Sequence, residues 1–233
     1  MGTTSYEEKR EQLEEYFDRT AADQWARLTS DEPVSGIRKT VRAGRERMRQ
    51  TLLEWLPHDL HGRRILDAGC GTGTLAVDLA LRGAHVVAID LSPTLVELAR
   101  KRVPDDLGEG KVEFVSGDML STSYGDFDHV VAMDSMIHYE RHDMVRVLSG
   151  LAQRTGRSLL FTFAPSNPIL ATMIRVGRIF PRSDRAPFIE PIAEASLRSA
   201  IGECTALSGW QIGNTEKISS GFYTSQAMEI QKR

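Results

Sequence analysis

From residue 61 onward, short apolar runs alternate with segments whose apolar positions recur at helical spacing. Apolar runs separated by amphipathic helices are typical of βαβ units, which build a parallel sheet. The runs that predict strands lie at residues 64–67, 85–90, 112–115, 127–133, 158–163, 210–213 and 222–230. The pattern therefore predicts an α/β fold built on a mostly parallel sheet.

Helical spacing also marks a long amphipathic segment at residues 35–56, which Pro57 ends. Its apolar stripe includes Ile37, Gly44 and Trp55. A glycine inside a helix is unfavourable by about 1 kcal/mol relative to alanine, so Gly44 predicts close approach of another backbone or of a ligand. Further helices are expected at residues 74–81, 93–102 and 193–207.

The chain has 233 residues, which is enough for one sizeable core with additions. Residues 1–60 are expected to form an N-terminal helical arm or cap, and residues 61–233 the core. A segment at residues 166–192 does not belong to a minimal α/β unit, and its apolar face lies opposite a row of arginines. This segment predicts a lid. The alternative is that its apolar face is core and its arginines only promote solubility.

Composition narrows the classes of function. The net charge of −3 argues against nucleic acid as the main partner. The two cysteines, Cys70 and Cys204, do not follow the pattern of a secreted disulfide scaffold, so a cytoplasmic location is expected. The acidic N-terminus does not resemble a signal peptide, and no run approaches the roughly 18 apolar residues that span a membrane. Peripheral membrane contact stays open.

The sequence ILDAGCGTG at residues 65–73 is the strongest chemical motif. Its spaced glycines, Gly69, Gly71 and Gly73, let backbone N–H groups approach a ligand at the start of a helix. From Gly71 the loop also matches the dinucleotide pattern G-x-G-x-x-A, which leaves an oxidoreductase as an alternative. A carboxylate at Asp67 suits an ammonium group better than a pyrophosphate. The motif therefore favours S-adenosylmethionine, which carries an α-amino group and an adenosine.

Acidic residues at the next two strand ends extend this site. Asp90 ends the second strand, 17 residues after Gly73, where a carboxylate can accept hydrogen bonds from ribose hydroxyls. Its alternative role is an N-cap, for which Ser92 is better placed. After the third strand, Asp118 can accept a hydrogen bond from the adenine amino group, while Met119 packs on the adenine ring. The alternative is that Asp118 only forms the turn.

The fourth strand is expected to deliver His138 and Tyr139 to the reacting group, although a histidine at such a place is often only a structural hydrogen-bonding residue. Two rows of arginines suggest an anionic substrate, with solvated surface as the alternative. They comprise Arg38, Arg42, Arg45 and Arg49 in the long helix, and Arg175, Arg178, Arg182 and Arg185 in the expected lid.

These motifs together resemble class I S-adenosylmethionine-dependent methyltransferases and, more narrowly, the magnesium-protoporphyrin IX O-methyltransferases. One departure is Thr29, which stands where the family has a tyrosine four residues after the arm tryptophan. The narrower resemblance rests on Tyr16, Phe17 and Trp25, on VRAG at 41–44, DSMIHY at 134–139, FTFAP at 161–165, IFP at 179–181 and FYTS at 222–225.

The resemblance implies a Rossmann-like class I methyltransferase fold with a seven-stranded mostly parallel sheet, an N-terminal arm and a small lid after the fifth strand. It implies transfer of a methyl group from S-adenosylmethionine to one propionate of magnesium protoporphyrin IX in (bacterio)chlorophyll biosynthesis. The products are the monomethyl ester and S-adenosylhomocysteine. Magnesium would arrive only within the porphyrin. A magnesium chelatase subunit would hand over the substrate, and contact with a photosynthetic membrane would be peripheral.

The resemblance also implies roles for individual residues of the site. The catalytic candidates are His138 and Tyr139. The cofactor-binding candidates are Asp67, Gly69, Cys70, Gly71, Gly73, Asp90, Leu91, Asp118, Met119 and Met133, and the substrate-binding candidates are Tyr16, Trp25, Arg42, Arg175 and Arg178. Two alternatives stay open: a methyltransferase for another hydrophobic acceptor such as a quinone precursor, and a non-catalytic porphyrin carrier.

Overall fold

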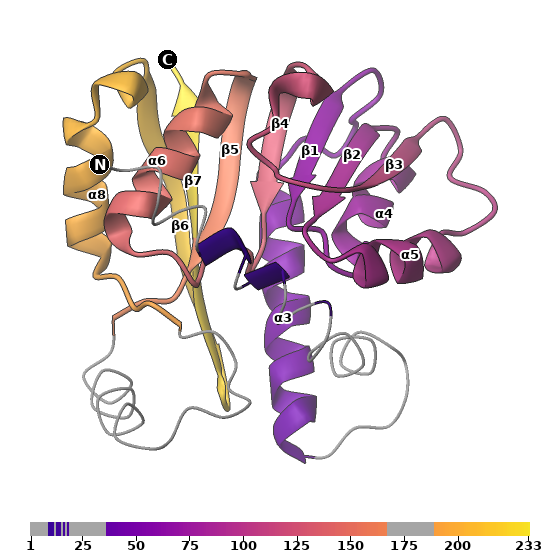
Figure 1. Cartoon of the computed structure of the whole chain (residues 1–233), viewed down its shortest axis with the longest axis horizontal. Coiled ribbons are helices and arrows are strands. Elements are labelled where there is room, and N and C mark those ends of the chain that lie inside the picture. The colour runs from indigo at the N-terminus through magenta and orange to yellow at the C-terminus, as the bar shows by residue number, and fades with distance from the viewer. Residues whose placement is uncertain (1–8, 12, 15, 17, 19–35, 167–188) are drawn as a thin grey trace.

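One seven-stranded sheet runs through the part of the chain that the computed structural model describes, residues 9–11, 13–14, 16, 18, 36–166 and 189–233 (Figure 1). The strand order is β3-β2-β1-β4-β5-β7-β6, and β7 alone runs antiparallel to the other six strands. The predicted mostly parallel sheet is therefore confirmed. Its strands are β1 (Arg64–Ala68), β2 (His85–Asp90), β3 (Lys111–Ser116), β4 (Phe127–Ala132), β5 (Thr155–Phe163), β6 (Trp210–Ser220) and β7 (Tyr223–Lys232).

Helices cover both faces of this sheet, and alternate strand residues show which helices lie on which face. Ile65 of β1 packs in a core cluster with residues of α3, α4 and α5, while the adjacent Leu66 packs in a second cluster with residues of α6 and α8. Successive side chains of a strand point to opposite faces, so the molecule has three layers. The helices are α3 (Gly36–Trp55), α4 (Thr74–Leu81), α5 (Pro93–Arg102), α6 (Arg141–Ala152) and α8 (Glu194–Glu203), with 3₁₀ turns at Thr122–Tyr124 and Thr205–Leu207.

The order of the strands places a switch point between β1 and β4. The chain runs outward from β1 through β2 to β3, then returns to the other side of β1 for β4. In open α/β sheets, ligands bind outside the carboxyl ends of the strands at such a point. The loops after β1, β2 and β4 therefore meet where a ligand is expected.

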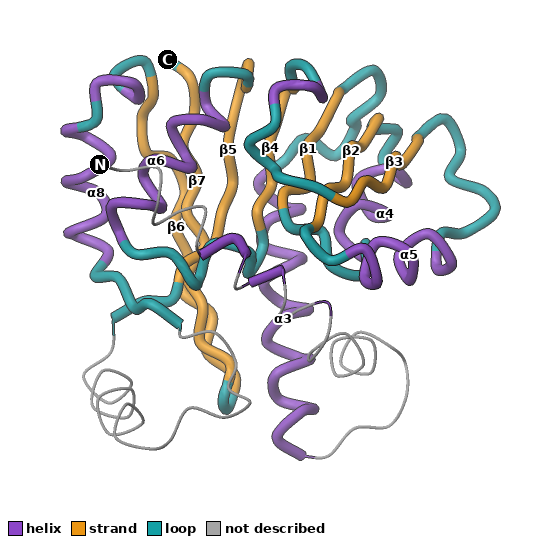
Figure 2. Tube along the Cα trace, in the orientation of Figure 1, coloured by secondary structure: helices purple, strands orange, loops and turns teal. Residues whose placement is uncertain are grey.

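The described residues of the N-terminal arm lie along this same edge (Figure 2). Leu13 is buried in the core cluster of α6 and α8. Arg10 forms an ion pair with Asp118 at 3.1 Å, and the Asp18 carboxylate accepts a hydrogen bond from Ser92 Oγ at 3.1 Å. The arm is thus tied to the loops that follow β2 and β3.

The segment expected to be a lid, residues 166–192, is described only at its two ends. Ser166 N donates to Ile192 O, and Ile192 N donates to Ala164 O, both at 2.9 Å. These bonds bring the start and the end of the insertion together beside the end of β5. Residues 167–188 lie outside the described residues, so the role of a lid stays a prediction.

Helix α3 packs against the hairpin of β6 and β7, and both extend in the same direction past the rest of the sheet (Figure 1). The close approach predicted at Gly44 is made by a side chain, the ring of Tyr223. Ile37, expected on the buried stripe, is instead 57% exposed. The buried face of α3 therefore begins at Gly44.

Substituting Gly44 by alanine tests this contact. An added Cβ would lie 2.8 Å from Tyr223 Cγ. Moving the ring should cost about 1–3 kcal/mol, which exceeds the gain of up to about 1 kcal/mol in helix propensity. A net loss near 1 kcal/mol corresponds to a fall of about 2–4 °C in Tm for a chain of this size, measured by thermal unfolding.

Gly202 in α8 provides the matched control, since no atom lies within 4 Å of a Cβ built there. Gly202→Ala should leave Tm unchanged or raise it. An equal rise in Tm for Gly44→Ala would contradict the proposed packing.

Candidate active site

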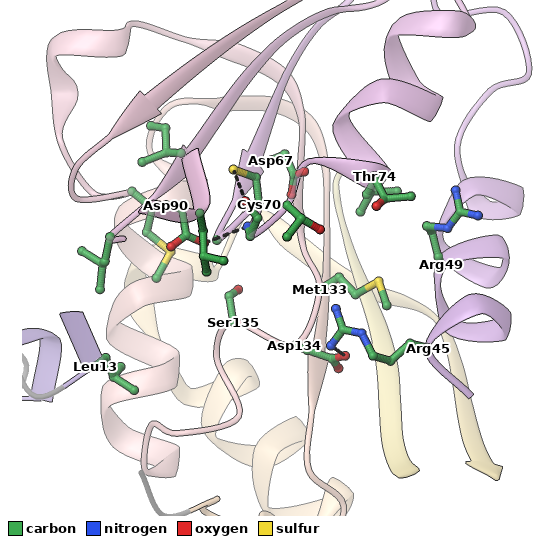
Figure 3. A pocket seen from close by; sticks show the side chains of 18 of the residues that line it. Leu13, Arg45, Arg49, Asp67, Cys70, Thr74, Asp90, Met133, Asp134 and Ser135 are labelled. Carbon is green, nitrogen blue, oxygen red and sulfur yellow. Dashed lines mark hydrogen bonds and ion pairs between the residues drawn. The ribbon is translucent and has the colours of Figure 1, made fainter. Parts of the chain in front are cut away.

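A cavity of about 320 Å³ opens where the loops after β1, β2 and β4 meet (Figure 3). This volume lies at the lower end of the range for small-molecule sites. Most of the residues predicted from sequence come together in its wall: Arg42, Asp67, Gly69, Cys70, Gly71, Asp90, Leu91, Asp118, Met119, Met133, His138 and Tyr139.

The remaining predicted residues lie elsewhere or are not described. Gly73 has a φ of 80°, precedes α4 and packs against Phe114. Tyr16 is half-buried, and burial raises the pKa of its phenol. Trp25, Arg175 and Arg178 lie outside the described residues.

The glycine loop is held by hydrogen bonds to β2. Gly69 N and Cys70 N both donate to Ile89 O, at 2.8 and 2.9 Å. The Asp90 carboxylate accepts from Gly71 N at 2.8 Å and from Ser92 N at 2.9 Å, which fixes its orientation at the cavity wall. Each oxygen of an ionised carboxylate can accept a further hydrogen bond, so Asp90 can still bind hydroxyl groups of a ligand.

Asp67 is the most unusual group in this wall. Its side chain is 2% exposed, and among the described residues its Oδ2 has no hydrogen-bond partner. Burial, and then the negative charge of Asp90, raise the pKa of Asp67 to about 7. Burying an unpaired acceptor is costly, and a cationic ligand donor would remove that cost.

A second buried polar atom lines the cavity after β4. Ser135 Oγ also has no hydrogen-bond partner in the described part of the chain. A Cβ on Gly69 would collide with the side chain of Ser135, so the glycine loop and the loop after β4 touch at this position. Ser135 was not predicted as a site residue.

The buried Arg154, which was not predicted as a site residue, holds the loop after β3 by hydrogen bonds to its backbone. Arg154 is 7% exposed and donates to the carbonyl oxygens of Met119 and Ser121. Asp118 accepts from Leu120 N at 2.8 Å and pairs with Arg10, so the arm and the loop share this carboxylate. From sequence alone, a buried arginine in the turn before a strand cannot be told from an exposed one.

His138 and Tyr139 are 7% and 1% exposed and both line the cavity. Backbone bonds hold the segment that carries them. Tyr139 N donates to Met136 O at 3.1 Å, and Glu190 N donates to Ile137 O at 2.9 Å. The segment after β4 is therefore tied to the end of the insertion.

Asp134, the first residue of DSMIHY, forms a polar cluster that the sequence did not predict. Its backbone has a φ of 54°, a left-handed conformation that is uncommon outside glycine. Its carboxylate accepts from Arg45 Nη1 at 2.6 Å and from Tyr223 Oη at 3.1 Å. Thr162 Oγ1 and Ser225 Oγ each donate at 3.3 Å. Burial, and then the charge of Asp134, raise the pKa of Tyr223.

Among the helices in the described ranges, none is both long and apolar enough to cross a bilayer. Within residues 36–166, 189–233 and the described arm positions, no group of three or more His, Cys, Asp or Glu side chains is placed to hold a metal ion.

Comparison with known families gives two matches. Residues 132–232 match the family described as magnesium-protoporphyrin IX methyltransferase C-terminus, and residues 65–156 match a methyltransferase domain. Together these matches span the sheet and the segment that carries His138.

Individual relatives match over nearly the whole chain. A magnesium-protoporphyrin O-methyltransferase of Rhodobacter capsulatus is 46% identical over 97% of this chain and 98% of its own length. A protein of that name from Synechocystis is 30% identical over 93% and 94% of the two chains.

A crystal structure of the magnesium protoporphyrin IX methyltransferase from Synechocystis, with bound S-adenosylhomocysteine, has a similar fold. The two structures superpose over 97% of this chain and 100% of the Synechocystis chain, with a TM-score of 0.84 and 29% sequence identity. By this likeness in fold and by identity along its whole length, the chain belongs to the magnesium-protoporphyrin O-methyltransferase family.

Proposed function

We propose that the protein transfers the methyl group of S-adenosylmethionine to one propionate carboxylate of magnesium protoporphyrin IX, giving the monomethyl ester and S-adenosylhomocysteine in (bacterio)chlorophyll biosynthesis. The similarity to the Rhodobacter capsulatus enzyme, 46% over 97% of the chain, carries this proposal. The cavity at the switch point of the sheet supports it, because its acidic wall suits a cationic cofactor and its arginines suit an anionic acceptor.

Residues of the cavity wall fit the cofactor group by group. The unpartnered Asp67 Oδ2 suits the α-ammonium group, and the fixed carboxylate of Asp90 suits the ribose hydroxyls. Asp118 and Met119 are assigned to the adenine, with Arg10 as a second partner of Asp118. When bound, the cofactor supplies an electrophilic methyl group on a sulfonium.

The acceptor chemistry sets what the chain must do. A propionate resembles a glutamate side chain, with a pKa of about 4.3, so it is ionised at neutral pH without a strong base. The remaining tasks are to hold the carboxylate in line with the methyl group and to exclude water. We assign the orientation of the carboxylate to His138 and part of the pocket wall to Tyr139, which are both buried beside the cavity. Arg42, in α3, adds positive charge to the lining of the cavity.

Several parts of the chain are proposed to guide the approach of the substrate. Tyr16, Trp25, Arg175 and Arg178 are proposed to contact the porphyrin from the arm and the insertion. A magnesium chelatase subunit is proposed to hand over the substrate. Peripheral membrane contact is supported by the exposed Phe222, at the turn between β6 and β7, and Ile37 in the first turn of α3, which are 73% and 57% exposed.

Incubation of the purified protein with S-adenosylmethionine and magnesium protoporphyrin IX tests the proposed function. Chromatography with mass detection should show a porphyrin that has gained one methyl group in place of a proton, over multiple turnovers. The dimethyl ester of the porphyrin is the control, since it offers no free carboxylate. Methylation of a quinone precursor in place of the porphyrin, or porphyrin binding without S-adenosylhomocysteine formation, would overturn the proposal.

His138→Ala tests whether a base is needed. Because the acceptor is already ionised, we expect kcat to fall by less than about 100-fold, the lower limit of the usual general-base contribution. The cofactor Kd should not change. His142→Ala, at an exposed histidine four residues further on, is the control and should retain full activity. Complete loss of turnover with intact cofactor binding would make His138 an acid or base.

The pH dependence of cofactor binding tests Asp67. With a pKa of about 7, this carboxyl is mostly protonated at pH 6 and mostly ionised at pH 7.5. Only the ionised form pairs with an ammonium group, so the cofactor affinity should rise about five- to tenfold over this range, measured by calorimetry. Asp67→Asn should bind more weakly and without that dependence. A wild-type affinity that does not change with pH would remove Asp67 from the ammonium site.

A further inference from the structure

The hydroxyl group of Ser135 is buried in the cavity wall and has no role in the proposed function. Its Oγ has no hydrogen-bond partner among the residues that the structure describes. In Figure 3 this oxygen points toward the glycine loop that carries Cys70. A buried hydroxyl without a partner destabilises the fold, because it has lost its hydrogen bonds to water. A ligand that bonds to Ser135 Oγ would remove this cost.

The neighbours of Ser135 fix its place in the wall. The preceding Asp134 turns the chain with a φ of 54°. Asp134 N donates to Thr162 Oγ1 at 2.7 Å, and its carboxylate accepts from Arg45 Nη1 at 2.6 Å. The following Met136 is fully buried in the core. The backbone of Ser135 is therefore held from both sides, without any bond made by its own hydroxyl.

This placement brings Ser135 next to the glycine loop. Strands β1 and β4 are parallel neighbours, with Asp67 opposite Val131. A Cβ built on Gly69 would lie 3.0 Å from Ser135 Oγ, so the hydroxyl lies against the loop two residues after Asp67. Among the described residues that line the cavity, Asp67 Oδ2 and Ser135 Oγ are the two buried side-chain oxygens without a hydrogen-bond partner. One comes from the end of β1 and the other from the loop after β4.

The charges at this end of the cavity favour a cationic donor as the shared ligand group. An ammonium group carries several N–H donors, as a lysine side chain does, so it needs more than one acceptor. Asp67 supplies a charged acceptor, and the negative charge of Asp90 already opposes its ionisation. A further carboxylate here would add to this repulsion. A neutral hydroxyl supplies the second acceptor without adding charge.

We propose that Ser135 Oγ accepts a hydrogen bond from the α-ammonium group of the cofactor, beside Asp67, an inference that rests on the proposed function. On this assignment β1 supplies the charged acceptor and the loop after β4 supplies the neutral one. The ribose hydroxyls stay with Asp90. The ammonium group is the same in S-adenosylmethionine and S-adenosylhomocysteine, so Ser135 stabilises the binding of both.

Ser135→Ala tests the contact by calorimetry. The Kd of S-adenosylmethionine and that of S-adenosylhomocysteine should each rise by about tenfold, as expected for the loss of a hydrogen bond to a charged group. The probe for the ammonium group is S-adenosylhomocysteine with hydrogen in place of that group. It should bind the variant and the wild type equally. Ser208→Ala, at an exposed serine that does not line the cavity, is the control and should bind all three ligands normally.

The cofactor-free protein provides a second readout, of opposite sign. Ser135→Ala removes a buried hydroxyl that has no partner, so its Tm without ligand should stay unchanged or rise by up to a few degrees. The increase in Tm that S-adenosylhomocysteine produces should be smaller in the variant than in the wild type. Ser135→Cys, in which a weak acceptor replaces the hydroxyl, should also bind the cofactor more weakly and serves if Ser135→Ala does not fold.

Three outcomes would overturn the inference. The first is an unchanged Kd of S-adenosylhomocysteine in Ser135→Ala, whether or not the Tm falls. The second is a loss confined to S-adenosylmethionine, because Ser135 would then contact the sulfonium. The third is an equal loss for the ligand without the ammonium group, because Ser135 would then contact another part of the cofactor.

These measurements use no porphyrin, so they are separate from the test of the proposed function. If the wild type binds the cofactor but forms no ester, the proposed function fails and the Kd values still decide the role of Ser135. If the wild type forms the ester and Ser135→Ala binds the cofactor normally, only the inference about Ser135 fails.

Discussion

The carbonyl oxygen of Ile89, at the end of β2, is the constraint on which the site depends. It accepts hydrogen bonds from Gly69 N and Cys70 N and so holds the end of β1 against the end of β2. The missing Cβ of Gly69 lets Ser135, after β4, pack on the same spot. The ends of three strands meet at one glycine. A larger residue at position 69 would push apart the glycine loop, which is bonded to Asp90, and the segment that leads to His138.

The opposite wall depends on residues that are far apart in the chain. Gly44 leaves room for the ring of Tyr223, and the next residue, Arg45, reaches the carboxylate that the hydroxyl of Tyr223 also contacts. Asp134 and Tyr223 are separated by 89 residues. No periodicity or local motif encodes their meeting. The sequence could therefore suggest a cationic helix face but could not separate Arg45 from the arginines around it.

Local signals account for what the sequence predicted correctly. Ser92 caps α5 by accepting from Leu95 N, as its position before the helix predicted, and the predicted glycine loop lies in the cavity wall. The strand at 210–213 was predicted too short, because the rest of β6 is a polar edge defined by pairing with β7. The helix Arg141–Ala152 was not predicted, although its buried Met144 and Leu148 recur at helical spacing. The pattern for that helix was present in the sequence.

The two walls of the cavity require opposite charges. Burial raises the pKa of Asp67 to about 7, so its contribution to stability is complete below the ordinary pKa of about 3.9 and is lost as pH rises through about 7. A bound cation beside Asp67 offsets the free-energy cost of ionising this buried carboxyl. The arginines of α3, in contrast, favour a bound anion. Methyl transfer from a sulfonium to a carboxylate removes one positive and one negative charge. The ammonium group assigned to Asp67 keeps its charge, so the acidic wall fits S-adenosylhomocysteine as well as S-adenosylmethionine. The esterified carboxylate has lost its negative charge, so only the match to the arginines becomes weaker in the products.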